Sequence, residues 1–171
     1  TSNPFDITTI VYLDGDYRTT GSGNWLSNSA SPAIWERLSS GTWSASNSPA
    51  YSTTNTVYIR NGHTITSGGS FGNGVNLKIM DGGIFNANHP GTTNSIYVYD
   101  GGTLNLNASM RNNNAFELED NANFNINNLS NNNSAIWTGT EIFHPTSNVN
   151  IYEWDANNGT TSYRAVFNGT N

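Results

Sequence analysis

The strongest constraint on the fold of this chain is an internal repeat of about 20 residues. Four segments share an alternation of apolar and polar residues that ends in a turn of small residues, and they align without a gap: 56–62, 76–82, 95–101 and 115–121. Their turn residues, Asn61, Asp81, Asp100 and Asp120, lie 20, 19 and 20 positions apart. A unit this short cannot bury its apolar side alone, so it must stack on copies of itself.

The alternation within each repeat predicts two short β-strands joined by the turn. In a parallel β-helix each coil adds one strand to each face about 4.8 Å from the last, so equivalent residues form columns. The inward columns are expected to form the core: Val57, Leu77, Ile96, Phe116; Ile59, Ile79, Val98, Leu118; Ile65, Phe85, Leu104, Phe124; Ala87, Leu106, Ile126. We therefore predict an all-β fold, a short right-handed parallel β-helix (β-solenoid), with a jelly-roll β-sandwich as the alternative.

Composition agrees with a β-rich, folded chain. Only 11% of the 171 residues are charged, while Asn, Ser and Thr fill 69 positions; average domains have about 25% charged residues, and long helices depend on Glu, Lys, Arg, Ala and Leu. The 5 Trp, 8 Tyr and 7 Phe disfavour disorder. The lack of cysteine excludes a disulfide scaffold and thiolate metal sites. The few lysines and the many small polar residues favour an exported protein.

Charge excludes nucleic acid as a partner, and the distribution of apolar residues excludes a membrane span. The net charge is -6, and the 6 Lys and Arg residues form no run that could neutralise a phosphate backbone, which excludes nucleic acid. No stretch approaches the roughly 18 to 20 apolar residues that a membrane span requires.

Three regions are expected. Residues 1–54 form a Trp-rich strand and cap region, in which Trp25, Trp35 and Trp43 close one end of the stack or, alternatively, form an aromatic sugar-binding platform. Residues 55–147 are the coils. Residues 148–171 are a C-terminal coil or cap that we expect to continue in a longer parent protein.

The outward positions of the first strand suggest a ligand-binding face. It combines aromatic rings with one lysine, and its members are Tyr58, Lys78, Tyr97, Tyr99 and, in a degenerate next coil, Trp137. We expect this face to contact a polysaccharide, a cell-surface glycan or another surface protein. The outward positions of the second strand are rich in asparagine, which predicts ladders of side-chain hydrogen bonds along the stack; a flat amide array that binds sugars is the alternative.

The aspartate column Asp81, Asp100 and Asp120 permits two interpretations. Two carboxylates about 4.8 Å apart repel by roughly 1 kcal/mol in water, and a calcium ion held by carboxylates and carbonyls would relieve this repulsion. The simpler interpretation, which we prefer, is that each aspartate accepts hydrogen bonds from the backbone amides of its own turn. No other cofactor is indicated.

Catalysis is the alternative class of function. Glu117 and Glu119 point to the same face as Lys78 and Tyr97, and paired carboxylates serve glycoside hydrolases and lyases. A fragment of a β-helix polysaccharide lyase or glycoside hydrolase is therefore the second hypothesis. About five coils give a short, flat face without long loops to build a cleft, so we expect no enzyme activity.

The order of motifs also resembles a known class of domain. The motifs are Gly23-Asn24-Trp25, Trp35-Glu36, Gly41-Thr42-Trp43, Asn61-Gly62-His63-Thr64-Ile65-Thr66, the Asp-Gly-Gly turns, and Phe143-His144-Pro145-Thr146-Ser147. Together they resemble β-helical repeat domains in secreted and cell-surface proteins of Bacteroidetes-type bacteria, including adhesin-like cargo of the type IX secretion system. The resemblance spans roughly residues 20 to 155. It implies an exported, adhesive or structural module on the cell exterior, and it implies no substrate.

Overall fold

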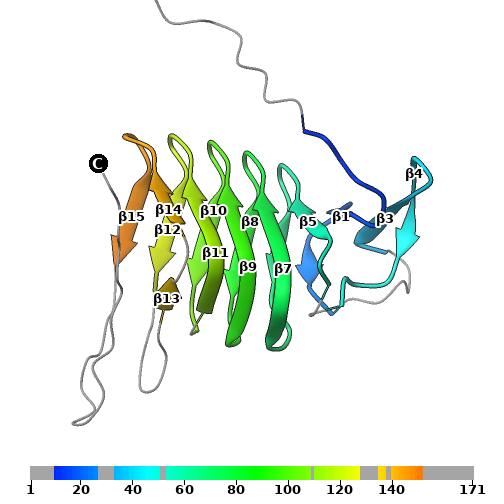
Figure 1. Cartoon of the computed structure of the whole chain (residues 1–171), viewed down its shortest axis with the longest axis horizontal. Coiled ribbons are helices and arrows are strands. Elements are labelled where there is room, and N and C mark those ends of the chain that lie inside the picture. Colours follow the sequence, from blue (N-terminus) through cyan, green and yellow to red (C-terminus); the bar gives the residue numbers. More distant parts are fainter. Residues whose placement is uncertain are drawn as a thin grey trace, which may run out of the picture.

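Figure 1 shows the computed structural model as a row of β-strands that follow one another along the long axis of the molecule. It describes residues 10–26, 33–50, 53–108, 110–127, 135–137 and 140–151, with backbone only at 71–73, 111 and 135–137. The described residues are all-β, and their strands form two sheets.

The nine-stranded sheet, sheet A, has the order β13-β11-β9-β7-β5-β1-β3-β4, and β14 also pairs with β11. Its strands are β1 (Tyr17–Thr19), β3 (Trp35–Ser39), β4 (Thr42–Ser46), β5 (Thr56–Ile59), β7 (Phe71–Ile79), β9 (Gly91–Val98), β11 (Met110–Leu118), β13 (Ala135–Trp137) and β14 (Thr140–Phe143). The six-stranded sheet, sheet B, has the order β15-β12-β10-β8-β6-β2. Its strands are β2 (Gly23–Asn24), β6 (Thr64–Thr66), β8 (Ile84–Ala87), β10 (Thr103–Leu106), β12 (Asn123–Ile126) and β15 (Asn148–Ile151).

Successive repeats pair in parallel and in the register that the sequence predicts. In sheet A, Val57 lies opposite Leu77, Leu77 opposite Ile96 and Ile96 opposite Phe116. In sheet B, Ile65, Phe85, Leu104 and Phe124 are opposite one another in the same way. Every residue of the predicted inward columns is at most 1% exposed. The core prediction is confirmed, and the jelly-roll alternative is wrong, because a jelly roll is built from antiparallel strands.

The repeats that contain β7, β9 and β11 have one more strand segment than expected. The strand β11 pairs through Met110–Asn112 with β13 and through Ala115–Leu118 with β14, and its register against β9 shifts between Asn112 and Ala115. The added segment contributes a buried column of Val75, Thr93 and Asn112, in which the Thr93 hydroxyl donates to Asn112 Oδ1 at 3.1 Å. The sequence pattern missed this column because only one of its three members is apolar.

Four turns between the two sheets, at 60–63, 80–83, 99–102 and 119–122, share one geometry. Their third residues, Gly62, Gly82, Gly101 and Asn121, have φ of 73°, 64°, 73° and 58°. Each turn is closed by a hydrogen bond from its fourth amide to its first carbonyl, at 2.8 to 3.1 Å. A positive φ at the third position alone is the mark of a type II turn, which favours Gly or Asn there. At Gly101 any added Cβ would also collide with the Asp81 carboxylate of the preceding turn.

The N-terminal region contributes strands to both sheets and forms one edge of sheet A. The strands β1 and β2 pair in parallel with β5 and β6, while β3 and β4 form an antiparallel hairpin that ends sheet A. Trp25 and Trp35 are fully buried, with ring centroids 5.1 Å apart. Their indole N–H groups donate to the carbonyls of Pro49 and Trp25. Trp25 and Trp35 therefore belong to the core, whereas Trp43 does not.

Candidate functional site

A continuous row of polar and aromatic side chains crosses the outer face of sheet A. Strand pairing places Arg18 opposite Tyr58, Tyr58 opposite Lys78, Lys78 opposite Tyr97 and Tyr97 opposite Glu117. We call these five residues the outer row. Because side chains alternate between the two faces of a strand, the inward neighbours of the row fill the core and the row itself faces outward.

Lys78 lies at the centre of this row among three tyrosine rings. Its ammonium nitrogen is 5.6 Å from the ring centroid of Tyr58, 5.5 Å from that of Tyr97 and 5.9 Å from that of Tyr99. Tyr99 lies two residues after Tyr97, directly after the end of β9 at Val98, and its ring contacts the same ammonium group. A cation over a ring face is worth about 0.5–1 kcal/mol at exposed sites. The three contacts therefore hold the lysine and the rings in one fixed arrangement.

Tyr58 belongs to this arrangement as a buried residue and not as an exposed one. It is only 2% exposed, and the ring of Tyr12 covers it with a centroid separation of 4.7 Å. Its hydroxyl donates to the carbonyl of Val11 at 3.4 Å. Burial raises the pKa of Tyr58, and the nearby Asp16 carboxylate raises it further. The expectation of an exposed Tyr58 is thus corrected, because the sequence pattern gave no sign that residues 11 and 12 cross this strand.

The aromatic surface continues from Tyr12 into the N-terminal hairpin. Tyr12 meets Trp43 edge to face with centroids 5.3 Å apart, and the guanidinium of Arg18 lies 4.2 Å from the Trp43 ring centroid. Arg18 also donates to Glu36 Oε2 at 2.8 Å, which fixes the guanidinium in place. We call Trp43, Tyr12, Tyr58, Tyr97 and Tyr99 the aromatic strip. It joins two regions that the sequence pattern treats as separate.

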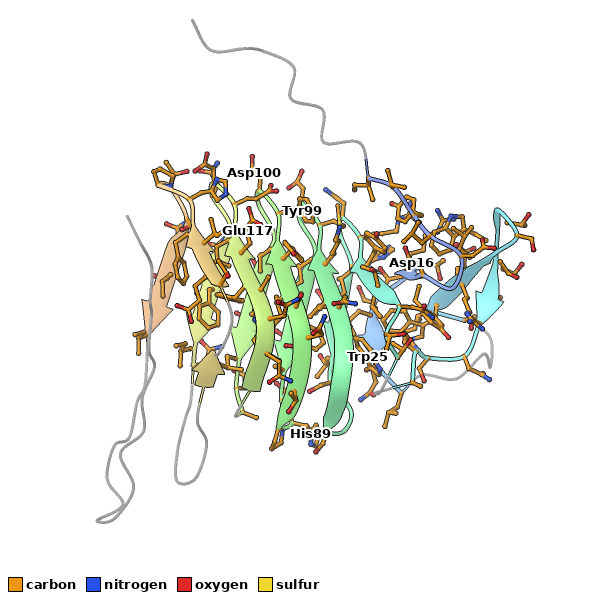
Figure 2. All side chains as sticks on the ribbon, in the orientation of Figure 1. Asp16, Trp25, His89, Tyr99, Asp100 and Glu117 are labelled. Atoms are coloured by element: carbon orange, nitrogen blue, oxygen red, sulfur yellow. The ribbon has the colours of Figure 1, made fainter. Side chains whose placement is uncertain are left out.

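The other end of the row is acidic, and its carboxylates are engaged. Glu117 Oε1 lies 3.1 Å from His144 Nε2, and Glu119 Oε2 accepts the Asp100 amide at 3.2 Å. Figure 2 shows Tyr99 and Glu117 close to the turn that carries Asp100. Burial raises the pKa of Tyr99, and the charges of Glu119 and Glu117 add to this effect.

Trp137 does not extend the outer row. Its backbone lies in β13, which pairs with the first segment of β11, and Asn112 is its partner. The backbone register instead places Ile142 of β14 beside Glu117. The Trp137 side chain lies outside the described residues. The prediction failed because the chain is longer between the last two turns: Asp120 and Pro145 are 25 residues apart, against 20 between Asp100 and Asp120.

Two aspartates of the turn column, Asp100 and Asp120, accept hydrogen bonds from the next turn along the stack. Asp100 Oδ1 accepts from the amide side chain of Asn121, and Asp120 Oδ1 accepts from both the backbone amide and the hydroxyl of Thr146. The two bonds from Thr146 lower the pKa of Asp120. We expected each aspartate to accept hydrogen bonds from the backbone amides of its own turn. The donors to Asp100 and Asp120 lie in the next turn instead. Within the described ranges, no group of three or more His, Asp or Glu side chains could hold a metal ion.

Asparagine ladders run along the outer face of sheet B, as predicted. The amide nitrogen of each asparagine donates to the oxygen of its counterpart one repeat earlier at 2.7 to 2.9 Å. One ladder contains Asn86, Asn105, Asn125 and Asn150, and the other contains Asn88, Asn107 and Asn127. The asparagine-rich face therefore holds neighbouring repeats together.

Comparison with known proteins found no matching family model, no matching curated protein and no matching solved structure. In the part of the chain that the structure describes, no helix has the length and apolar character needed to cross a membrane.

Proposed function

We propose that this chain is a non-catalytic, exported surface module that binds glycan through the outer face of sheet A. The observation that carries the proposal is the group of Lys78, Tyr97 and Tyr99 on a regular parallel sheet. Tyr97 and Tyr99 are partly exposed, and both hold Lys78 by their rings.

The chemistry of this group suits a sugar. A tyrosine presents an apolar ring body with a polar tip, which matches the C–H face and the hydroxyl rim of a pyranose. The Lys78 ammonium can donate hydrogen bonds to sugar hydroxyls. Side chains held on a sheet lose little freedom when a ligand binds, so less of the interaction energy is spent on ordering them.

The proposed architecture is a right-handed parallel β-solenoid with a Trp-rich cap. In-register parallel pairing in both sheets supports stacked coils, and the antiparallel hairpin over β1 supports a cap. Location on the cell exterior and an adhesive or structural role, as in the type IX secretion cargo that the motifs resemble, are parts of the same proposal. The composition, poor in lysine and rich in Asn, Ser and Thr, supports export.

We propose that the chain is not catalytic because both candidate carboxylates already make hydrogen bonds within the fold. Glu117 is occupied by His144, and Glu119 is occupied by the Asp100 amide. A glycosidase needs one carboxylate aimed at the leaving oxygen and another at the anomeric carbon or a water. Side chains committed to structural hydrogen bonds are poorly placed for either role.

A retention assay on immobilised polysaccharides tests the proposal. The wild-type chain and the Tyr97→Ala variant are compared with a Thr103→Ala control on the opposite sheet, with calcium and with a chelator, and released reducing or unsaturated ends are measured in the same wells. We expect retention without product, about tenfold weaker binding for Tyr97→Ala, and no change for the control. Product release, or equal binding by Tyr97→Ala, would contradict the proposal.

A further inference from the structure

We infer that the ligand is a neutral, linear glycan that lies along the stacking axis and occupies two subsites at once. The repeat subsite consists of Lys78, Tyr97 and Tyr99. The cap subsite consists of Tyr12, Arg18 and Trp43, which have no place in the repeat pattern. This inference rests on the proposed function and adds a second site, the class of ligand and its direction.

The two subsites form one surface because their rings are in contact through Tyr58. Trp43 meets Tyr12 at 5.3 Å, Tyr12 meets Tyr58 at 4.7 Å, and Tyr58 meets the Lys78 ammonium at 5.6 Å. Tyr58 is buried against Tyr12 and also contacts Lys78, so it connects the two subsites from within the fold.

The direction of the strip follows from strand pairing. Arg18, Tyr58, Lys78 and Tyr97 stand on four neighbouring strands, which span about 14 Å at the usual strand spacing. This distance exceeds the length of a single sugar ring. In the direction of one strand, by contrast, the aromatic surface contains only Tyr97 and Tyr99. A ligand that contacts the whole strip must therefore be extended and must run across the strands.

The charges along the strip favour a neutral ligand. Carboxylates bound it at both ends, with Glu36 beside Arg18 and Glu117 beside Tyr97. The Arg18 charge is paired with Glu36, and the Lys78 charge faces three rings. A polyanion would meet both carboxylates in a molecule whose net charge is -6. A neutral chain can stack on the rings and use the charged groups as hydrogen-bond partners.

The test measures affinity against chain length by calorimetry. The probes are di- and hexasaccharides of neutral β-linked glucose and xylose, with oligogalacturonates of the same lengths as anionic probes. The proteins are wild type, Trp43→Ala, Tyr97→Ala and Ser44→Ala, the last being an exposed control on the same strand as Trp43. Thermal unfolding of each variant shows that it is folded, and Trp43→Phe replaces Trp43→Ala if the alanine variant is not.

We expect a neutral hexasaccharide to bind at least tenfold more tightly than the disaccharide, and Trp43→Ala to remove this advantage while Ser44→Ala keeps it. Tyr97→Ala should weaken binding of both lengths. The inference is wrong if Trp43→Ala binds the hexasaccharide as wild type does while Tyr97→Ala does not. It is also wrong if the oligogalacturonates bind more tightly than the neutral oligosaccharides. In both cases the proposed glycan-binding face remains. If wild type binds no glycan of either length or charge, the proposed function itself fails.

Discussion

Asparagine suits the outer face of sheet B because its side chain carries both a donor and an acceptor. In the ladder, Asn105 donates to Asn86 and accepts from Asn125, so one residue links three repeats. Serine or threonine would reach a shorter distance, and aspartate would lack the donor. The high asparagine content of the chain thus has a direct structural use on this face.

Tyr58 makes the free energy of unfolding depend on pH. Burial raises its pKa in the folded state, whereas the unfolded chain titrates near the ordinary value of about 10. Above that pH the unfolded state releases a proton that the folded state keeps, so the free energy of unfolding is constant below about pH 10 and falls as the pH rises further. Tyr99 acts in the same direction.

We therefore predict that Tyr58→Phe lessens the alkaline loss of stability and that the double variant Tyr58→Phe/Tyr99→Phe lessens it further. Urea unfolding of the three proteins between pH 8 and 11 measures this. A wild-type denaturation midpoint that stays constant across that range would show that neither tyrosine is protected in the fold.

At the scale of elements, the turn decides where one sheet ends and the other begins. Gly62 has a φ of 73°, and an added Cβ there would meet no atom within 4 Å, so backbone conformation alone limits substitution. Asn121 has a φ of 58° at the equivalent position, which shows that asparagine is accepted in this turn.

We predict that Gly62→Ala lowers the free energy of unfolding by about 1–2 kcal/mol and that Gly62→Asn lowers it by less. Chemical denaturation of the two variants beside wild type gives both values. Equal losses for alanine and asparagine would argue against a left-handed third position.

The repeat elements were predictable because each strand buries alternate residues against equivalent residues of its neighbours. This rule located the core columns and brought Lys78, Tyr97 and Tyr99 together. It could not locate Tyr12 and Trp43, because the N-terminal segment and hairpin do not follow the repeat. The rule also misplaced Trp137, because the chain between the last two turns is longer than in the other repeats. It missed the added strand segment, because polar residues, Thr93 and Asn112, stand in that segment's buried column.

At the scale of the whole molecule, the two ends of the described stack differ. At the N-terminal end, the β3–β4 hairpin is the edge of sheet A, and Trp25 and Trp35 are fully buried. In the last described strand, Val149 and Ile151 are 39% and 49% exposed, although their partners Phe124 and Ile126 are fully buried. The aromatic strip runs from the N-terminal hairpin, with Trp43 in β4, to Tyr97 in β9.

The central claim is that the repeats stack in parallel and in register, because the outer row exists only in that arrangement. Disulfide formation tests it directly in a chain without native cysteine. Thr103 pairs with Asn123, so Cys at both positions would stand about 4.8 Å apart at the Cα atoms, within the range of a disulfide. Cys at 103 and 125 would stand about 8 Å apart, which is too far.

We predict that Thr103→Cys/Asn123→Cys cross-links under mild oxidation, raises the thermal midpoint and loses this gain on reduction, while Thr103→Cys/Asn125→Cys remains reduced. Free thiols are counted by mass spectrometry after alkylation. Equal cross-linking of both pairs, or cross-linking of the 103/125 pair alone, would contradict the in-register stack and the outer row that depends on it.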